Sequence, residues 1–342
     1  MSDWHVTIEL NGGTGVDETT IRQTRVCVTG ASGFIGHHLC RYLKDKGFWV
    51  RAVDYKPPVH PVVADEVWWR CDLRYLGNAI DAVSGADWVF ALAADMGGMG
   101  YIGFHDWTIL HDNLLINQNT AKAIKDEGTL RVLYTSSACV YPERLQLLAE
   151  ARELAETDAW RGMPDTAYGV EKLVSERIYT RMGEASGTRV RIARFHNIYG
   201  PECTWRGGRE KAPAALCRKV AEAKLHGVRN INVWGDGEQT RSFCSIGDCL
   251  EMLFLLMTSD YDQPLNIGTD RAVSVNELVD IIAAHAGIEV EKDHDLTKPQ
   301  GVRGRNADLS QMREVLRYEP RVTLEEGIGR LYDWIESEVE RA

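Results

Sequence analysis

The sequence is short of positive charge and of long apolar runs. Its 342 residues include 39 Lys and Arg against 50 Asp and Glu, a formal net charge of −11. A chain this acidic is poorly suited to bind nucleic acid or an anionic membrane surface. No apolar run approaches the roughly 18 residues that a membrane span needs. The first ten residues, MSDWHVTIEL, also lack the basic start and apolar centre of a secretory signal. We therefore expect a cytoplasmic protein with neither a nucleic-acid nor a membrane partner.

The cysteines lack the spacing of a metal site. No two of them form a Cys-x-x-Cys pair, and their spacing matches no zinc pattern. In a cytoplasmic chain we expect them to be reduced and mostly buried as small apolar side chains, and we expect no metal. The eight are Cys27, Cys40, Cys71, Cys139, Cys203, Cys217, Cys244 and Cys249.

What the sequence has is a regular alternation of apolar strands and helices. Helical patterns follow the first strand up to Gly47 and recur at residues 106–127 and 166–185. Such alternation is typical of an α/β fold with a doubly wound parallel sheet. The expected strands are residues 26–29, 48–53, 68–72, 87–93, 130–136 and 188–195.

A glycine-rich turn, GASGFIG at residues 30–36, follows the first strand and opens a helix. Glycine is needed where the backbone turns tightly and where it must approach a pyrophosphate without a Cβ. The helix N-terminus then presents unpaired N–H groups to the phosphates. The turn therefore predicts a dinucleotide site of the Rossmann type, with contacts from Gly30, Gly33, Phe34, Ile35 and Gly36.

Two aspartates at strand ends complete this prediction. Asp54 closes the second strand, 18 residues after Gly36. A carboxylate there accepts hydrogen bonds from the adenosine ribose hydroxyls and repels a 2′-phosphate, which favours NAD over NADP. Asp72 ends another expected strand. Its side chain has two possible roles, a contact with the adenine or simple capping of a turn.

We divide the chain into three parts on this basis. Residues 1–24, which contain NGGTG, are expected to form a loose extension before an NAD-binding domain at residues 25–195. After Phe195 the chain becomes rich in Gly, Pro and charge, as in a loop. Residues 196–240 and 266–342 are assigned to a smaller C-terminal lobe that binds the substrate, with residues 241–265 rejoining the first sheet. Expected elements here are helices 213–226, 247–258, near 274–286 and 323–340, and strand 230–234.

A Tyr-x-x-x-Lys pair follows the expected strand at residues 130–136. Tyr168 and Lys172 lie at positions i and i+4, on one face of a helix. A tyrosine has a reference pKa of about 10, so it serves as a base only if positive charge stabilises the phenolate. Lys172 and an oxidised nicotinamide would supply that charge. The alternative is an exposed amphipathic pair.

The order of glycine turn, Ser137 and Tyr-x-x-x-Lys resembles the extended short-chain dehydrogenase/reductases, which act on nucleotide sugars. The resemblance implies that Ser137 hydrogen-bonds the reacting hydroxyl, Tyr168 takes its proton and Lys172 holds the cofactor ribose. Enzymes of this kind usually oxidise C4 of the sugar transiently, which acidifies the hydrogens at C3 and C5.

Cys139, in the stretch TSSACVYPE at residues 135–143, carries further chemistry. A related 4,6-dehydratase needs acidic residues beside the serine, where this chain has Ala138 and Cys139, and a 4-epimerase needs no extra group. A thiol, with a reference pKa of about 8.5, fits abstraction of a proton next to a ketone. Packing as a small apolar residue is the alternative.

Inversion of a carbon also requires a proton donor on the opposite face. Lys211 precedes Pro213, a favoured first residue of a helix. A cation at that helix end is unfavourable by about 0.3–1 kcal/mol, and the same field lowers the pKa of an amine. Lys211 is therefore the candidate acid, with a solvated surface lysine as the alternative.

Six stretches together resemble the GDP-mannose 3,5-epimerase family. The resemblance implies that Cys139 and Lys211 act at C5 and C3, that the product is GDP-L-galactose or GDP-L-gulose, and that the protein is a homodimer through helices near 106–127 and 166–185. Three alternatives to these implied roles stay open: Asn197 only caps a turn, Lys219 is a solvated helix residue, or Arg303 and Arg305 exchange roles. The stretches are residues 93–100, 136–143, 194–201, 207–215, 234–243 and 301–306. The implied substrate contacts are Gly97, Ser137, Asn197, Glu210, Lys211, Lys219, Gln239, Arg241 and Arg305.

Two other functions are considered. One is epimerase or mutase chemistry on a different nucleotide sugar, which binding of GDP against UDP sugars would distinguish. The other is a non-catalytic NAD-sensing module. Retention of both Tyr168 and Lys172 argues against the latter.

Overall fold

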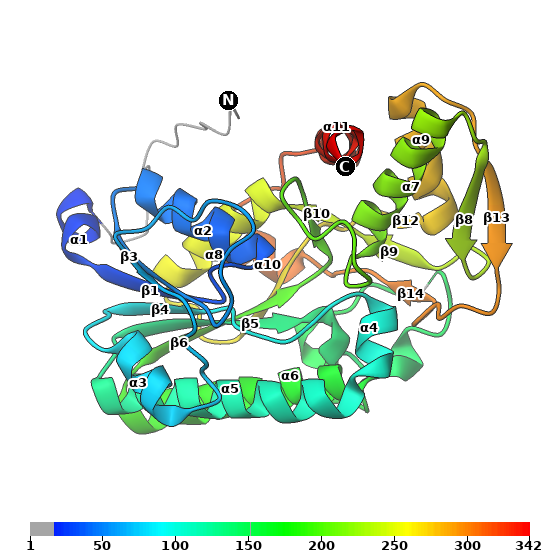
Figure 1. The fold of residues 1–342 in the computed structure, drawn as a ribbon. Coiled ribbons are helices and arrows are strands. Elements are labelled where there is room, and N and C mark those ends of the chain that lie inside the picture. The colour runs from blue at the N-terminus through cyan, green and yellow to red at the C-terminus, as the bar shows by residue number, and fades with distance from the viewer. Residues whose placement is uncertain (1–16, 151) are drawn as a thin grey trace.

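A parallel sheet lies at the centre of the computed structural model, which describes residues 17–150 and 152–342 (Figure 1). Its seven strands all run parallel, and the chain order reverses direction between β1 and β4. Along the sheet they are β11 (Pro264–Ile267), β6 (Arg189–Phe195), β5 (Arg131–Ser137), β4 (Trp88–Ala91), β1 (Arg25–Thr29), β2 (Trp49–Val53) and β3 (Glu66–Trp68). The fold is therefore the expected doubly wound α/β fold of Rossmann type.

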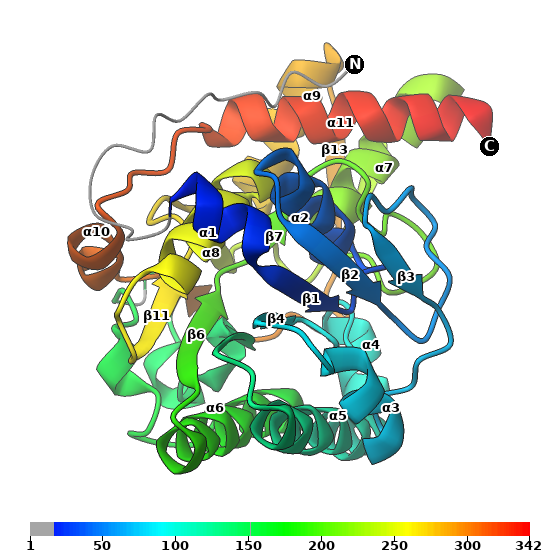
Figure 2. The ribbon, with the colours of Figure 1, turned by 90° about the vertical axis from the view of Figure 1, so that its left-hand side faces the viewer.

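Helices cover both faces of this sheet (Figures 1 and 2). Val26 and Val28 of β1 pack toward one helical layer, whereas Cys27 packs toward the other. The strands are buried on both faces, as a parallel sheet requires. One layer contains α2 (Phe34–Asp45), α8 (Ile246–Thr258) and α10 (Ser310–Leu316), and the other contains α3 (Leu76–Val83), α5 (Asp106–Glu127) and α6 (Ala167–Ser186).

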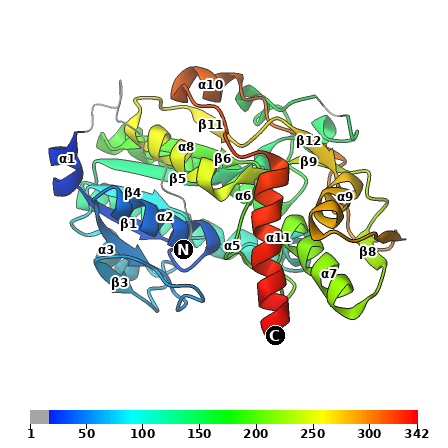
Figure 3. The same ribbon diagram turned by 90° about the horizontal axis from the view of Figure 1, so that it is seen from above.

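A second, smaller apolar core lies beyond the carboxyl ends of the strands. Helix α11 packs on α7 and α9 around Ile328, Leu331 and Ile335, and Figure 3 shows it lying between the main sheet and those two helices. The elements of this part are α7 (Ala212–His226), α9 (Val275–Ala286), α11 (Leu324–Arg341), β8 (Asn230–Trp234) paired with β13 (Glu291–Asp295), and β9 (Thr240–Ser242) paired with β12 (Ala272–Ser274) and β14 (Gly304–Arg305).

Short elements complete the structure. They are α1 (Glu18–Gln23), α4 (Met99–Phe104), β7 (Ile198–Tyr199) paired with β10 (Cys244–Ser245), and single 3₁₀ turns at Ala138–Val140, Glu143–Leu145 and Glu156–Asp158.

Local signals explain why the long helices begin and end where they do. Helix α6 begins after Thr166, whose hydroxyl accepts a hydrogen bond from the N–H of Gly169, and ends at Gly187 with φ of +79°. Helix α5 likewise ends at Gly128, with φ of +70°. These are the favoured N-cap and left-handed C-cap residues, and the expected range 106–127 is confirmed.

Three expectations were wrong. Strand β3 ends at Trp68, because Arg70 adopts a left-handed φ of +68°, so residues 68–72 are not a strand. Residues 18–23 form α1, capped by Asp17, and are not a loose extension. The segment after Phe195 also contains a strand, β7. The NGGTG stretch lies outside the described residues.

Among the residues described, no helix combines the length and the apolar character that crossing a bilayer requires.

Candidate active site

The glycine turn forms a tight cradle between β1 and α2. Gly30 has φ of +71°, and a Cβ there would lie 2.9 Å from the backbone nitrogen of Ala93. Gly33 is the N-cap of α2 and has no side-chain cap, so the first N–H groups of the helix lack a side-chain partner. Phe34, Ile35 and Gly36 form the first turn. An oxidised dinucleotide fits this cradle, because a pyrophosphate can approach the bare backbone and the positive end of the helix dipole.

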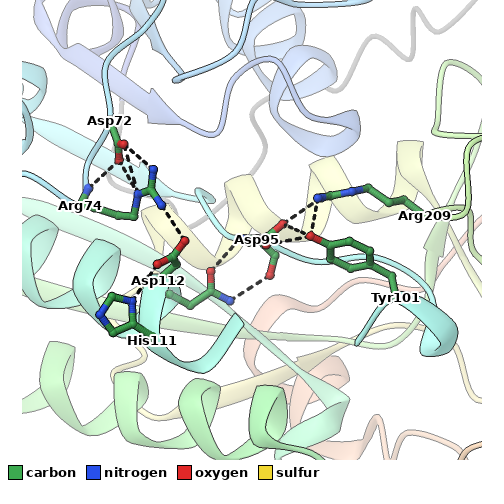
Figure 4. A network of polar contacts seen from close by, with 8 residues as sticks. Asp72, Arg74, Asp95, Tyr101, His111, Asp112 and Arg209 are labelled. Carbon is green, nitrogen blue, oxygen red and sulfur yellow. Dashed lines mark hydrogen bonds and ion pairs between the residues drawn. The ribbon is translucent and has the colours of Figure 1, made fainter. Parts of the chain in front are cut away.

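Asp54 directly follows β2, whereas Asp72 lies in the turn that follows the end of β3 at Trp68. The carboxylate of Asp54 accepts hydrogen bonds from the backbone N–H groups of Ser32 and Lys56, both at 3.0 Å, which ties the end of β2 to the glycine turn. Asp72 accepts from the backbone N–H of Arg74 and pairs with its guanidinium at 2.7 Å (Figure 4). That pairing lowers the pKa of Asp72. Asp72 therefore caps a turn, and a contact with adenine remains a prediction.

Ser137, Tyr168 and Lys172 meet at the carboxyl end of β5. Ser137 is the last residue of β5, and its hydroxyl accepts from the N–H of Cys139. Tyr168 and Lys172 are buried on α6, and the lysine amine lies 5.7 Å from the tyrosine ring centroid. Lys172 also donates to the carbonyl of Thr135 at 3.1 Å, which fixes α6 against β5.

Burial sets the acidity of this pair. It raises the pKa of Tyr168, while a hydrogen bond with Ser137 and the charge of Arg305 act in the opposite direction. Burial also lowers the pKa of Lys172. The phenol is therefore neutral here, and it becomes a base only when further positive charge is present.

Cys139 lies in the 3₁₀ turn just after β5, so it is not part of the strand itself. The nearest polar partner of its thiol is Arg305, whose Nη1 donates to Sγ at 3.0 Å. Arg305 is buried and is oriented by Gln146 at 2.5 Å and Asp165 at 3.4 Å. The contact places a fixed positive charge beside the sulfur, as at reactive cysteines.

Several predicted site residues surround this sulfur. Lys211 is the N-cap of α7, and its side chain reaches solvent, yet the protein around its amine lowers its pKa by desolvation. The Cys139 thiol has the opposite effect and raises the pKa of Lys211. The groups whose pKa the Cys139 thiol shifts are Tyr168, Lys172, Lys211, Arg241 and Arg305.

Arg241 and Arg305 bring two guanidinium groups close together. Burial, and then the nearby Arg305, lower the pKa of Arg241, although a guanidinium stays charged at any working pH. Arg241 donates only to the carbonyls of Thr240 and Val302, and none of the carboxylates in the described residues pairs with it. Such a cation is poised for an anionic ligand. Arg303, by contrast, pairs with Asp236 at 2.8 Å.

The other implied substrate contacts have structural partners. Asn197, at φ of +48°, donates to the Ser242 carbonyl, and Lys219 donates to the Asn232 carbonyl at 2.6 Å. Glu210 accepts from the N–H of Gly208 at 2.7 Å. Gln239 donates to the Trp234 carbonyl, and its side-chain oxygen is buried with no hydrogen-bond partner among the described residues.

Gly97 lies in the loop after β4, where a Cβ would lie 2.9 Å from the Tyr101 ring.

Sequence reasoning missed the residues that contact this loop and those that contact Arg305. Gln146 and Asp165 orient Arg305, and Asp95 and Tyr101 contact Arg209. Arg209 lies in the stretch 207–215 and Asp165 lies three residues before Tyr168, but the sequence does not indicate which residue either of them contacts.

Of the described residues, only His37, His38 and Glu202 group as metal ligands would. His37 contacts Glu202 at 2.9 Å, His38 contacts the Pro201 carbonyl at 3.1 Å, and Arg41 lies 3.5 Å from the same carboxylate. The polar atoms of this group are thus already in contact with one another.

Known proteins resemble this chain over most of its length. Residues 26–268 match the NAD dependent epimerase/dehydratase family. The chain is 42% identical over 321 residues to GDP-mannose 3,5-epimerase 1 of Oryza sativa subsp. japonica, covering 93% of this chain and 83% of that protein. It is 31% identical to MoeE5, solved with UDP-glucuronic acid and NAD, with a TM-score of 0.78 and coverage of 92% and 99%. UDP-glucose 4-epimerase of Thermotoga maritima, at 22% identity and a TM-score of 0.82, covers 92% of this chain and 100% of its own and shares the fold.

Proposed function

The chain belongs to the NAD dependent epimerase/dehydratase family, and on that premise we propose that it inverts C3 and C5 of GDP-mannose through a transient 4-keto sugar. The product is GDP-L-galactose, or GDP-L-gulose when only C5 inverts. The observation that carries the proposal is the Cys139 thiol beside Arg305, surrounded by the predicted hydride and proton-transfer groups.

NAD binds between the glycine turn and the ends of the first strands. Gly30 and the N-terminus of α2 would hold the pyrophosphate, and Asp54 would accept hydrogen bonds from the ribose hydroxyls. When bound, NAD supplies the reversible removal of a hydride from C4 of the sugar.

Oxidation at C4 depends on three side chains. Ser137 holds the C4 hydroxyl, and Tyr168 takes its proton. Lys172, buried beside the tyrosine ring, together with the positive charge of an oxidised nicotinamide would stabilise the phenolate form in which Tyr168 accepts this proton, and Lys172 would also orient the ribose. The resulting ketone acidifies the hydrogens at C3 and C5.

Proton transfer depends on Cys139 and Lys211. The thiolate removes the hydrogen next to the ketone, and Arg305 stabilises the sulfur charge before the transfer. Lys211 returns a proton to the opposite face, which inverts the carbon. General acid–base steps of this kind contribute about 10²–10⁴-fold to a rate.

The diphosphate is bound by Arg241, with Arg305 nearby. A half-buried guanidinium without a carboxylate partner among the described residues is stabilised by a bound anion, and its fork matches phosphate oxygens. Gly97, Asn197, Glu210, Lys219 and Gln239 line the remaining substrate site on this proposal.

Incubation with GDP-mannose in D₂O tests the reaction. We expect solvent deuterium at C3 and C5 of the product by NMR, and product without deuterium at either carbon would overturn the proposal. Cys139→Ala should lose at least about 100-fold in deuterium incorporation while still oxidising C4. Cys40→Ala serves as a control, because that thiol is buried in the main apolar core and no proposed catalytic group acts on it.

One of the relatives suggests a second candidate substrate class. MoeE5 was solved with a UDP sugar, so a UDP sugar is the second candidate. Calorimetric titration of the NAD-loaded protein with GDP-mannose and UDP-glucose decides between them. We expect measurable affinity for the GDP sugar alone.

The assembly and the location complete the proposal. The protein is a homodimer through α5 and α6, whose exposed faces include Trp107 and Val174. It resides in the cytoplasm, since all eight cysteines are free. Size-exclusion chromatography with light scattering tests the dimer, and a monomer mass would refute it.

A further inference from the structure

Two loops from distant parts of the chain are joined beside the site. One follows β4, and the other precedes α7 and contains Lys211. The N–H of Gly98 donates to the carbonyl of Arg209 at 3.1 Å. A Cβ on Gly98 would lie 2.5 Å from the carbonyl oxygen of Glu210. The two backbones are therefore in direct contact, one residue before Lys211.

Three side chains, Asp95, Tyr101 and Arg209, reinforce this junction, and we call them the latch (Figure 4). Arg209 Nη1 donates to Asp95 Oδ1 at 2.8 Å, and Nη2 donates to the Tyr101 hydroxyl. The guanidinium carbon also lies 3.8 Å from the centre of the Tyr101 ring. The Tyr101 hydroxyl donates to Asp95 Oδ2 at 2.9 Å, which closes a three-membered network.

The latch is anchored to the main sheet layer by Asn113 of α5. This asparagine is fully buried. It accepts from the N–H of Asp95 at 2.6 Å and donates to the carbonyl of Asp95 at 3.0 Å. A continuous series of hydrogen bonds thus runs from α5 through Asp95 to Arg209. Fully satisfied polar networks of this kind rigidify the groups they join.

The amine of Lys211 has no such support of its own. Within the described part of the chain, no carboxylate or carbonyl pairs with it, so its position depends on the backbone that the latch holds. We propose that the latch positions Lys211 for proton transfer at C3 and C5, whereas oxidation at C4 does not depend on it. This inference rests on the proposed function. Asp95, Tyr101 and Arg209 are positioning residues on this view.

Arg209→Met is the direct test, because it keeps side-chain bulk and removes the hydrogen bonds to Asp95, to Tyr101 and to the Met96 carbonyl. In D₂O with NAD-loaded enzyme and GDP-mannose, we expect deuterium incorporation to fall by about 100-fold, the usual effect of a misplaced catalytic group. C4 oxidation, followed as cofactor absorbance, should stay within about twofold. Arg209→Lys should recover part of the loss.

Arg206→Met is the matched control, since Arg206 lies in the same loop and is exposed, and the Trp205 ring is its only interaction partner among the described residues. It should leave both rates unchanged. Asp95→Asn should resemble Arg209→Met, and the double variant should be no worse than either, because contacts in one network are not additive.

A second measurement needs no turnover. Hydrogen exchange at the amides of residues 207–212, read by mass spectrometry, should be faster in Arg209→Met than in the wild type and unchanged in Arg206→Met. Equal exchange in all three proteins would overturn the latch, as would an equal loss of C4 oxidation and deuterium incorporation in Arg209→Met. Absence of deuterium in the wild-type product would instead remove the proposed function, and this inference with it.

Discussion

The cofactor end and the sugar end of this site are built in different ways. The cofactor end is one continuous segment, residues 25–54, in which β1, the glycine turn, α2 and Asp54 follow directly. The sugar end joins residues far apart in the chain, such as Arg305 with Cys139 and Arg209 with Asp95. Backbone geometry holds the first end, and side-chain hydrogen bonds and ion pairs hold the second.

This difference separates the two halves of the proposed chemistry. Hydride transfer depends on the cofactor end and on α6, whose position is fixed by β5. Proton transfer depends on side-chain networks that can be removed one at a time. Substitutions at the cofactor end should therefore abolish all activity, and substitutions at the sugar end should affect proton transfer alone.

Gly30→Ala should have the largest effect, because it breaks the cofactor end. A left-handed φ costs a residue with a side chain about 1–2 kcal/mol, and the new Cβ would meet the backbone of Leu92 and Ala93 at 2.9 Å. We expect calorimetry to show NAD affinity reduced by at least about 100-fold, with C4 oxidation and deuterium incorporation lost together. Gly77→Ala, where nothing lies within 4 Å, should leave both intact. NAD affinity within threefold of the wild type in Gly30→Ala would contradict the comparison.

Gly98→Ala should come next, because it drives a methyl group between the two latched loops. The nearest atom is a backbone carbonyl oxygen at 2.5 Å, so the loop that carries Lys211 must move. We expect deuterium incorporation to fall by up to about 100-fold with unchanged NAD affinity. Gly103→Ala, in the same helix and with open space around it, is the control. Loss of NAD affinity in Gly98→Ala would show that the two ends are not separable.

Sequence patterns predicted the cofactor end better than the sugar end for a physical reason. Alternating apolar residues and capping signals are local, so the strands predicted at residues 26–29 and 48–53 lie within one residue of the bounds of β1 and β2. The contact of Arg209 with Asp95 spans 114 residues, and no local pattern encodes it. Local reasoning also failed at Arg70, whose left-handed backbone ends the sheet early. Ser137 and Cys139 could be proposed from the sequence because they lie two residues apart where β5 ends, and their catalytic roles stay predictions.

Arg305→Met should have an intermediate effect, limited to the sulfur. Without the guanidinium at 3.0 Å, the Cys139 sulfur loses its electropositive neighbour, a feature of reactive cysteines, and alkylation by iodoacetamide at pH 7.5 should slow by roughly tenfold. Peptide mass spectrometry resolves Cys139 from the other thiols. Arg303→Met should alkylate at the wild-type rate, because Arg303 pairs with Asp236. Equal slowing in both variants would mean that Arg303 and Arg305 cannot be assigned different roles at the sulfur.

His196→Gln should have the smallest effect at neutral pH, and it tests the sheet that both ends share. His196 is fully buried at the end of β6, and its Nε2 donates to Asn266 Oδ1 at 3.0 Å. Its Nδ1 has no partner among the described residues, so a second proton there would lack an acceptor. Burial, together with the charges of Arg305 and Arg194, lowers the pKa of His196 to about 3.

The sign of the pH effect follows from that shift. Between the unfolded pKa of about 6.5 and the folded pKa of about 3, the unfolded chain binds the proton and the folded chain does not. Stability is therefore lost as the pH falls below about 6.5, by about 1.4 kcal/mol per pH unit, or about 2 kcal/mol at pH 5. Urea unfolding at pH 7 and pH 5 should show that His196→Gln loses about 2 kcal/mol less than the wild type across this interval. His226→Gln, at an exposed position, should decline as the wild type does. Neither end of the site contains His196. Deuterium incorporation per folded molecule should therefore not follow the loss of unfolding free energy between pH 7 and pH 5. The two measurements together separate the stability of the shared sheet from the chemistry at its edge.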